Sequence, residues 1–76
     1  MGQEKILKYL EKCQNPVTRK QIADNILEDA IKVSKALKKL VKQKYVSFIE
    51  HDVETARELV DYYLVRRTRF FFLIRD

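Results

Sequence analysis

Cysteine, histidine and glycine each occur only once in this 76-residue sequence, as Cys13, His51 and Gly2, and tryptophan is absent. One cysteine excludes an internal disulfide, and one thiol with one imidazole cannot complete a tetrahedral zinc site. One glycine excludes a glycine-rich phosphate loop, and no arrangement of serine, histidine and aspartate stands out. We therefore expect no enzyme, no cofactor and no metal, and no small-molecule ligand can be inferred.

Long apolar runs are also missing. The longest is Phe70–Ile74, far below the roughly 20 residues of a membrane helix. The N-terminus lacks the basic and then apolar pattern of a signal peptide, so we expect a cytoplasmic protein with no membrane contact. The length indicates a single domain over residues 1–76. Because domains this small bury only about 60% of their unfolded surface, close helix packing or a homodimer is needed for stability.

Positive charge is concentrated in one segment of the chain. The net charge is +5, yet residues 1–29 have five Lys or Arg and five Asp or Glu, a balance of zero. Residues 30–49 contain six lysines and no acid, and residues 50–61 contain five acids and one arginine. Residues 62–76 contain four arginines and one acid. A segment with positive charge alone favours a polyanionic partner.

Three helices are expected in the first half. Apolar residues at helical spacing predict a first helix over 3–13, which ends at Asn15-Pro16 because the residue before proline avoids helical geometry. Thr18, followed three residues later by Gln21, predicts a capping box for a second helix that reaches about Ile26. Asp29 predicts the N-cap of a third helix over about 29–43. The residues expected to face the core are Ile6, Leu7, Leu10, Cys13, Ile22, Ala23 and Ile26.

The third helix has two faces of opposite character. At about 100° per residue, one face, within roughly 80–180°, holds Ala30, Val33, Leu37, Leu40 and Val41. The opposite face, within roughly 240–360°, holds Lys32, Lys35, Lys38, Lys39 and Lys42. Ile31, at about 260°, lies within the lysine face, where an apolar side chain suits a thymine methyl group. The pattern predicts one face packed on the core and one cationic face.

Two interpretations remain open for the C-terminal part. Tyr45–Glu50 is expected to be a strand, because β-branched and aromatic residues are enriched there. In one interpretation, residues 51–59 form a turn and residues 60–67 return as the second strand of a β-hairpin wing. In the other, Asp52 caps a helix over 53–66, and Thr68–Arg75 is the returning strand. Periodicity favours the second interpretation, whereas the resemblance described next slightly favours the first.

The order of residues around the lysine face matches a known pattern. Ile22-Ala23 is followed, ten residues after the alanine, by Val33, then by Ser34-Lys35, and then by a Leu-x-x-Leu. Over about residues 3–50 this resembles the helix-turn-helix of winged-helix regulators of the MarR-like kind. The resemblance implies a winged helix-turn-helix of the α+β class, mainly α, with three helices followed by a small β-hairpin wing. The helix-turn-helix would cover about 18–43, and the wing and C-terminal segment about 45–76, with an extra helix or strand.

The chain departs from that family pattern in the turn and in the wing. The family often has glycine four residues after the alanine, where this chain has Leu27. We expect Asn25, which tolerates left-handed geometry, to end the second helix instead. The turn is acidic at Glu28 and Asp29, and acids that face phosphate would repel it. Residues 50–61 are net negative, so we expect a wing that avoids DNA or one in which arginines at 66, 67 and 69 make the contact.

These features predict a transcription regulator that binds double-stranded DNA sequence-specifically, with the 29–43 helix in the major groove. The C-terminal segment, either Phe70–Ile74 or 53–66, is expected to form a homodimer interface, and Tyr62 and Tyr63 to pack in the core or between copies. The alternatives are a protein–protein adaptor that uses the acidic 50–61 block, and RNA or single-strand binding through C-terminal Arg and Phe residues. The residues expected to contact DNA are Arg19, Lys20, Ile31, Lys32, Ser34, Lys35, Lys38, Lys39, Lys42, Arg66 and Arg67.

Overall fold

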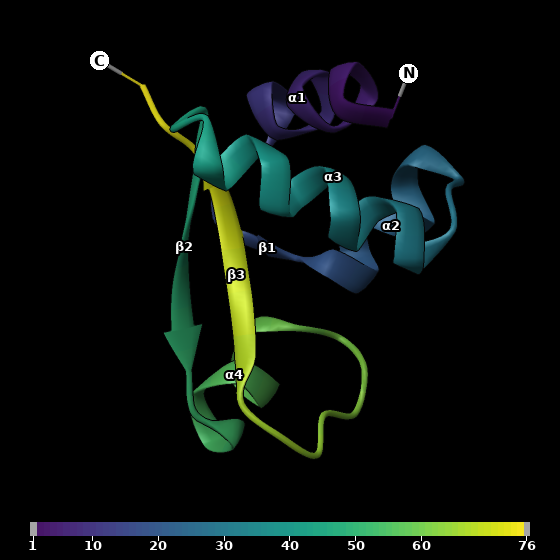
Figure 1. Ribbon diagram of the computed structural model, residues 1–76. Helices are drawn as coiled ribbons and strands as arrows, with labels where there is room; N and C mark the ends of the chain where they lie inside the picture. The colour runs from purple at the N-terminus through teal and green to yellow at the C-terminus, as the bar shows by residue number, and fades with distance from the viewer. Residues whose placement is uncertain (1, 76) are drawn as a thin grey trace.

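The computed structural model describes residues 2–75, which form a small α+β fold with four helices and a three-stranded antiparallel sheet (Figure 1). The helices are α1 (Gly2–Lys12), α2 (Arg19–Ile26), α3 (Ala30–Lys42) and α4 (Val53–Leu59). The strands are β1 (Val17–Thr18), β2 (Val46–His51) and β3 (Thr68–Leu73). The α+β class expected from the sequence is confirmed. The two ends of the expected single domain, Met1 and Asp76, lie outside the described residues.

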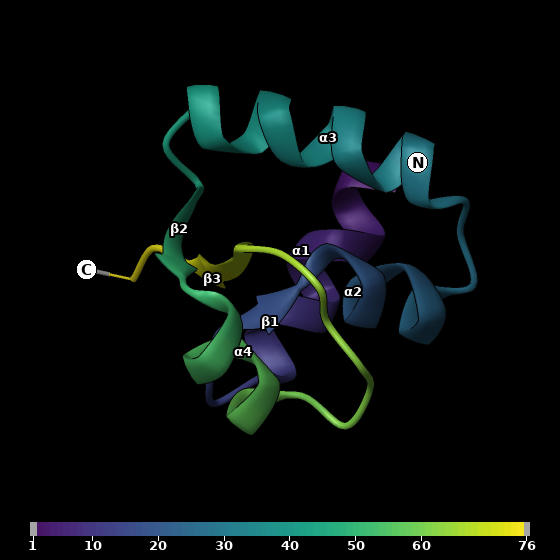
Figure 2. The same cartoon turned by 90° about the horizontal axis from the view of Figure 1, so that it is seen from below.

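The first three helices pack together at one end, and the sheet extends away from them towards α4 (Figures 1 and 2). The main core joins the three helices to the upper part of the sheet, through Val46 and Phe71. Its other buried members come from the helices and are Ile6, Leu10, Ile22, Ala23, Val33, Leu37 and Leu40. Over residues 2–75, no helix combines the length and the apolar character needed to cross a membrane.

The predicted division of α3 into two faces is confirmed with one exception. Val33, Leu37 and Leu40 are buried, Val41 is half-buried, and all five lysines of the opposite face are exposed. Ala30, which was expected to face the core, is exposed. The reason is its position as the first residue of α3, next to the exposed turn between α2 and α3.

Both predicted helix starts are confirmed in detail. The Thr18 hydroxyl accepts a hydrogen bond from the Gln21 backbone N–H at 3.1 Å, and the Gln21 side-chain oxygen accepts one from the Thr18 N–H at 2.9 Å. This is the reciprocal capping box, which pairs two N–H groups that the helix leaves without partners. The Asp29 carboxylate caps α3 by accepting a hydrogen bond from the Ile31 N–H at 3.0 Å.

The prediction that Asn25 ends α2 is wrong. Leu27 takes the left-handed conformation itself, with φ 58° and ψ 44°, and its N–H bonds to the Ala23 carbonyl. Asn25 remains helical because its side-chain amide donates to the Gln21 carbonyl at 2.7 Å. A left-handed residue other than glycine costs roughly 1–2 kcal/mol. The chain therefore adopts with a leucine a backbone conformation that glycine would adopt without this cost.

The β-hairpin with a returning strand over 60–67 is also wrong. Asp52 caps a helix, as in the second interpretation, and its carboxylate accepts a hydrogen bond from the Thr55 N–H at 2.8 Å. The returning strand is β3, which begins at Thr68 as that interpretation predicts. However, α4 ends at Leu59 instead of residue 66, and residues 60–67 form a loop, here called the 60–67 loop.

Strand β3 occupies the centre of the sheet, in the order β1-β3-β2. Phe70 pairs with Thr18 on β1 and with Ile49 on β2, so both backbone edges of the central strand are occupied. Successive side chains of a strand point to opposite faces, so Phe70 lies on the face away from Phe71. Phe70 is nonetheless only 1% exposed, whereas Ile74, just beyond the strand, is 40% exposed. Much of the segment expected to form a dimer interface is therefore packed within one chain.

Candidate nucleic-acid interface

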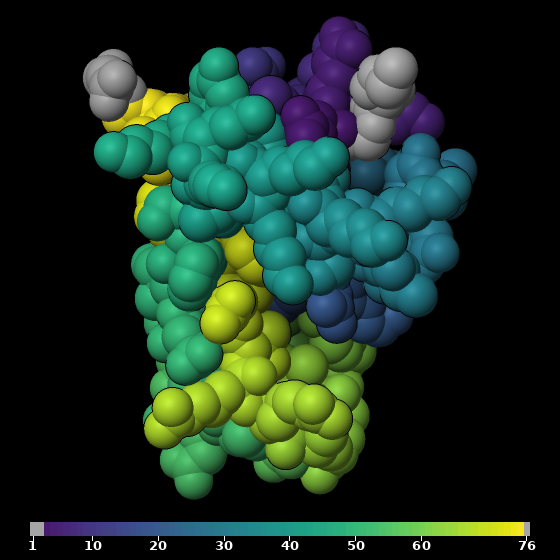
Figure 3. All heavy atoms as spheres, in the orientation of Figure 1, coloured from purple at the N-terminus to yellow at the C-terminus, as the bar shows by residue number. Residues whose placement is uncertain are grey.

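A groove of about 960 Å³ lies between α3, the start of α2, the β2–β3 sheet and the 60–67 loop. In the space-filling view of Figure 3, the teal atoms of α3 lie above the yellow-green atoms of the loop, with dark blue atoms from the region of α2 between them. Its lining includes Phe48 and Phe71, whose ring centroids are 5.7 Å apart. The cationic residues that line it are Arg19, Lys20, Lys38, Arg66, Arg67 and Arg69.

The groove brings together predicted site residues from three separate parts of the sequence. Those that line it are Arg19, Lys20, Ser34, Lys38, Arg66 and Arg67. The remaining predicted residues are exposed on α3 outside the groove lining, and are Ile31, Lys32, Lys35, Lys39 and Lys42. The lysine face of α3 therefore has one edge, at Ser34 and Lys38, that turns towards the groove.

Half of the six cations that line the groove have no acidic partner within residues 2–75. Lys20 pairs with Asp24 at 3.2 Å, and Arg67 and Arg69 both approach Glu50, at 3.7 and 3.9 Å. In the same described part of the chain, no ion pair involves Arg19, Arg66 or any of the lysines of α3. These charges are left to interact with an external anion.

The two acids of the turn before α3 repel an approaching anion less strongly than two unpaired carboxylates would, because both have partners within the fold. Glu28 lies 3.3 Å from the Lys5 ammonium group and so pairs with α1. The carboxylate of Asp29 is engaged as the N-cap of α3. Both carboxylates therefore have partners within the fold, and the lysine face of α3 begins directly after them.

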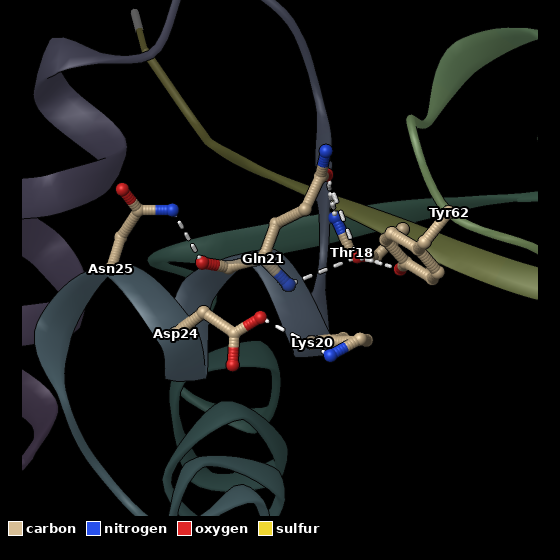
Figure 4. A network of polar contacts seen from close by, with 6 residues as sticks. All are labelled: Thr18, Lys20, Gln21, Asp24, Asn25 and Tyr62. Carbon is tan, nitrogen blue, oxygen red and sulfur yellow. Dashed lines mark hydrogen bonds and ion pairs between the residues drawn. The ribbon is translucent and has the colours of Figure 1, made fainter.

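Tyr62 attaches the 60–67 loop to the start of α2 (Figure 4). Its hydroxyl lies 2.6 Å from the Thr18 hydroxyl, the same group that caps α2, and Thr18 is buried. The Lys20 ammonium lies 5.4 Å from the centre of the Tyr62 ring. The expectation that Tyr62 packs in the core or between copies missed this contact. No local pattern could have predicted it, since the two hydroxyls are 44 positions apart in the sequence.

Arg57 holds the other part of the loop. Its Nε donates a hydrogen bond to the Leu64 carbonyl at 2.7 Å, and its guanidinium lies 4.3 Å from the centre of the Tyr63 ring. At the start of α4, hydrogen bonds from the Thr55 backbone N–H and side chain lower the pKa of Asp52. The connection from β2 to β3 is thus fixed at its helical start and along the loop, which keeps Arg66 and Arg67 beside the groove.

Replacing Tyr62 with Phe tests whether this contact positions the loop. The ring is retained and the hydroxyl bond is lost, so we expect a loss of about 1 kcal/mol of stability and faster amide hydrogen exchange across residues 60–67. Tyr63→Phe is the matched control, because Tyr63 is exposed and its hydroxyl forms no hydrogen bond within residues 2–75. Equal exchange in the loop of wild type and Tyr62→Phe would show that the bond does not hold the loop.

No protein-family model, curated protein or solved structure matches this chain. Among the residues that the structure describes, no three His, Cys, Asp or Glu side chains come close enough to hold a metal ion. Cys13 is half-buried near Tyr9, where burial and a hydrogen bond with the thiol raise the pKa of the tyrosine to about 12. The charged groove beside α3 is therefore the candidate functional site of this chain.

Proposed function

We propose that the chain is a winged-helix protein that binds double-stranded DNA sequence-specifically, as a transcription regulator. The fold supports this assignment through its element order, in which α1, β1, α2, α3, β2 and β3 follow one another and the sheet order is β1-β3-β2. In this assignment α2 and α3 form the helix-turn-helix. The connection between β2 and β3, with α4 and the 60–67 loop, forms an enlarged wing.

The observation that carries the proposal is the convergence of six cationic side chains on one groove beside an exposed lysine face. They come from α2, from α3, and from the 60–67 loop with β3, three parts of the chain that are distant in the sequence. A face that served only to keep the chain in solution would not require cations from three parts of the chain to meet. Three of the six, Arg19, Lys38 and Arg66, form no ion pair within residues 2–75, and convergent positive charge of this kind is typical of a surface that binds the phosphate backbone.

The geometry indicates how a duplex would lie. The major groove of B-DNA, about 12 Å wide, admits one α-helix, and α3 is the helix whose exposed face carries lysines and no acid. With α3 in the major groove, one sugar–phosphate strand would pass through the protein groove between α3 and the 60–67 loop. Arg19 and Lys38 would contact it from the helices, and Arg66 and Arg67 from the loop. Lys32 and Lys35 would reach neighbouring phosphates or guanine edges. In a homodimer, the second copy would place its own α3 on an adjacent half-site of the DNA.

Single-strand binding through the C-terminal aromatic residues receives less support. Phe70 and Phe71 are buried, so their faces are not free to stack on bases. An adaptor function through the acidic block of residues 50–61 is also less well supported. Glu50 pairs with two arginines, so part of the negative charge of the block is already neutralised within the chain. Duplex DNA is the partner that uses the exposed cations without rearrangement of the core.

The experiment that tests the proposal is binding to random-sequence duplex DNA as a function of salt. With four or five phosphate contacts, the logarithm of the association constant should fall against the logarithm of salt concentration with a slope near −4. Selection of a specific site would follow. Absence of binding at low salt would refute DNA binding and favour the adaptor. Tighter binding to single-stranded than to duplex DNA of the same sequence would refute the placement of α3 in a major groove.

A further inference from the structure

The corner between α2 and α3 presents two large apolar side chains that the fold does not use. Leu27 is 89% exposed and Ile31, in the first turn of α3, is 64% exposed. Neither belongs to the hydrophobic core or to the partly buried residues packed against it. The corner forms one edge of the molecule, beyond the ends of both helices (Figures 1 and 2).

Leu27 is an unfavourable choice at this position on structural grounds alone. Its left-handed backbone, with φ 58°, suits glycine, and asparagine is the next best residue. Because the leucine side chain is exposed to solvent, it buries little apolar area that could offset the energetic cost of that strain. Residues held in strained backbone conformations are concentrated at active sites, ligand-binding sites and switch regions.

The surroundings of the two side chains determine which partner suits them. The acids between them are engaged, Glu28 with Lys5 and Asp29 as the N-cap of α3. Lys32 and Lys35 follow directly and are exposed. An apolar pair followed by lysines that form no ion pair within residues 2–75 matches a polyanion that also carries apolar groups. In the major groove, the 5-methyl group of thymine is the apolar group that the base pairs present.

We propose that Leu27 and Ile31 form an apolar contact surface that recognises thymine methyl groups and gives this protein a preference for thymine at the positions facing the α2–α3 corner. The inference rests on the proposed DNA binding and extends it to sequence preference. The lysines beside the corner contact phosphates of any sequence, whereas the two apolar side chains distinguish thymine from cytosine and uracil. Leu27 is then a specificity-determining residue, and its exposed side chain is explained by the bound state.

The test compares two duplexes of identical A·T-rich sequence, one with thymine and one with deoxyuridine, which lacks the methyl group. Wild type should bind the thymine duplex about fourfold more tightly for each methyl group contacted. The preference should fall in Leu27→Gly and in Ile31→Ala, while the salt slope stays unchanged because no charge is removed. Leu27→Gly should also unfold at a higher temperature, since glycine relieves the left-handed strain, and a loss of preference then cannot come from misfolding.

Leu59→Ala is the matched control, because Leu59 is another exposed leucine, on α4 and outside the groove lining. It should keep the full preference for thymine. Salt-dependent binding with equal affinity for the two duplexes would overturn the inference and leave the proposed DNA binding intact. No binding to either duplex would overturn both. A preference that survives in Leu27→Gly and Ile31→Ala would place the methyl contact on other residues and refute the role assigned here.

Discussion

Replacing Arg19, Lys38 and Arg66 together with glutamine is expected to weaken duplex binding about 500-fold at roughly 0.1 M salt. Each phosphate contact contributes about 0.9 to the salt slope, so three contacts account for about 2.7 decades of affinity at that concentration. The slope itself should become less negative by about 2.7. The three side chains come from α2, α3 and the 60–67 loop, and within residues 2–75 none forms an ion pair. Fluorescence anisotropy with a labelled duplex over a range of salt concentrations measures both quantities.

The matched control removes the same charge elsewhere. Lys8→Gln, Lys12→Gln and Lys44→Asn together change three exposed lysines that lie outside the groove lining. Asparagine is used at position 44 because Lys44 has φ 66°, and asparagine tolerates left-handed geometry. This control should keep most of the affinity and the slope. An equal loss in both triple variants would mean that binding follows net charge alone, and the groove would no longer be the interface.

The helical half of the fold was largely predictable because its signals are local. A capping box needs only Thr18 and Gln21, three positions apart, and the two faces of α3 follow from spacing within one helix. The end of α2 was mispredicted because Asn25 has the better left-handed propensity, yet its side chain bonds to the Gln21 carbonyl and Leu27 takes the strained geometry. The geometry of the turn requires a left-handed residue at position 27, and this requirement outweighs the left-handed propensity of Asn25.

The C-terminal half was not predictable to the same degree because distant contacts determine it. Apolar spacing continues past Leu59 to Leu64, so periodicity alone extends α4 too far. The helix instead ends at Leu59. In the loop that follows, the Tyr62 hydroxyl contacts that of Thr18, 44 positions away, and the Leu64 carbonyl accepts a hydrogen bond from Arg57. The groove has the same origin. Sequence identified most of its cations, but their convergence depends on where the 60–67 loop folds back.

Replacing Phe70 with alanine is expected to cost about 3–5 kcal/mol, the usual range for a buried phenylalanine. A chain of this length has roughly 4–11 kcal/mol of stability in total, so the variant should lose from about a quarter to all of it. The ring is 1% exposed on the central strand, and the His51 imidazole packs edge-on against it at 5.1 Å between centroids. Thermal and denaturant unfolding followed by circular dichroism measure the loss.

The Phe70→Ala variant also shows whether the Phe70 ring is buried within one chain or at an interface between two copies. If Phe70 is packed inside each chain, the loss of stability relative to wild type should be the same at every protein concentration, because the substitution then leaves association between copies unchanged. Ile74→Ala is the matched control, since Ile74 is 40% exposed just beyond the same strand, and it should cost far less. A Phe70→Ala protein that stays folded but sediments with half the mass of wild type would place the ring at an interface between copies. The homodimer would then use β3 itself, and the packing described here for the sheet would be wrong.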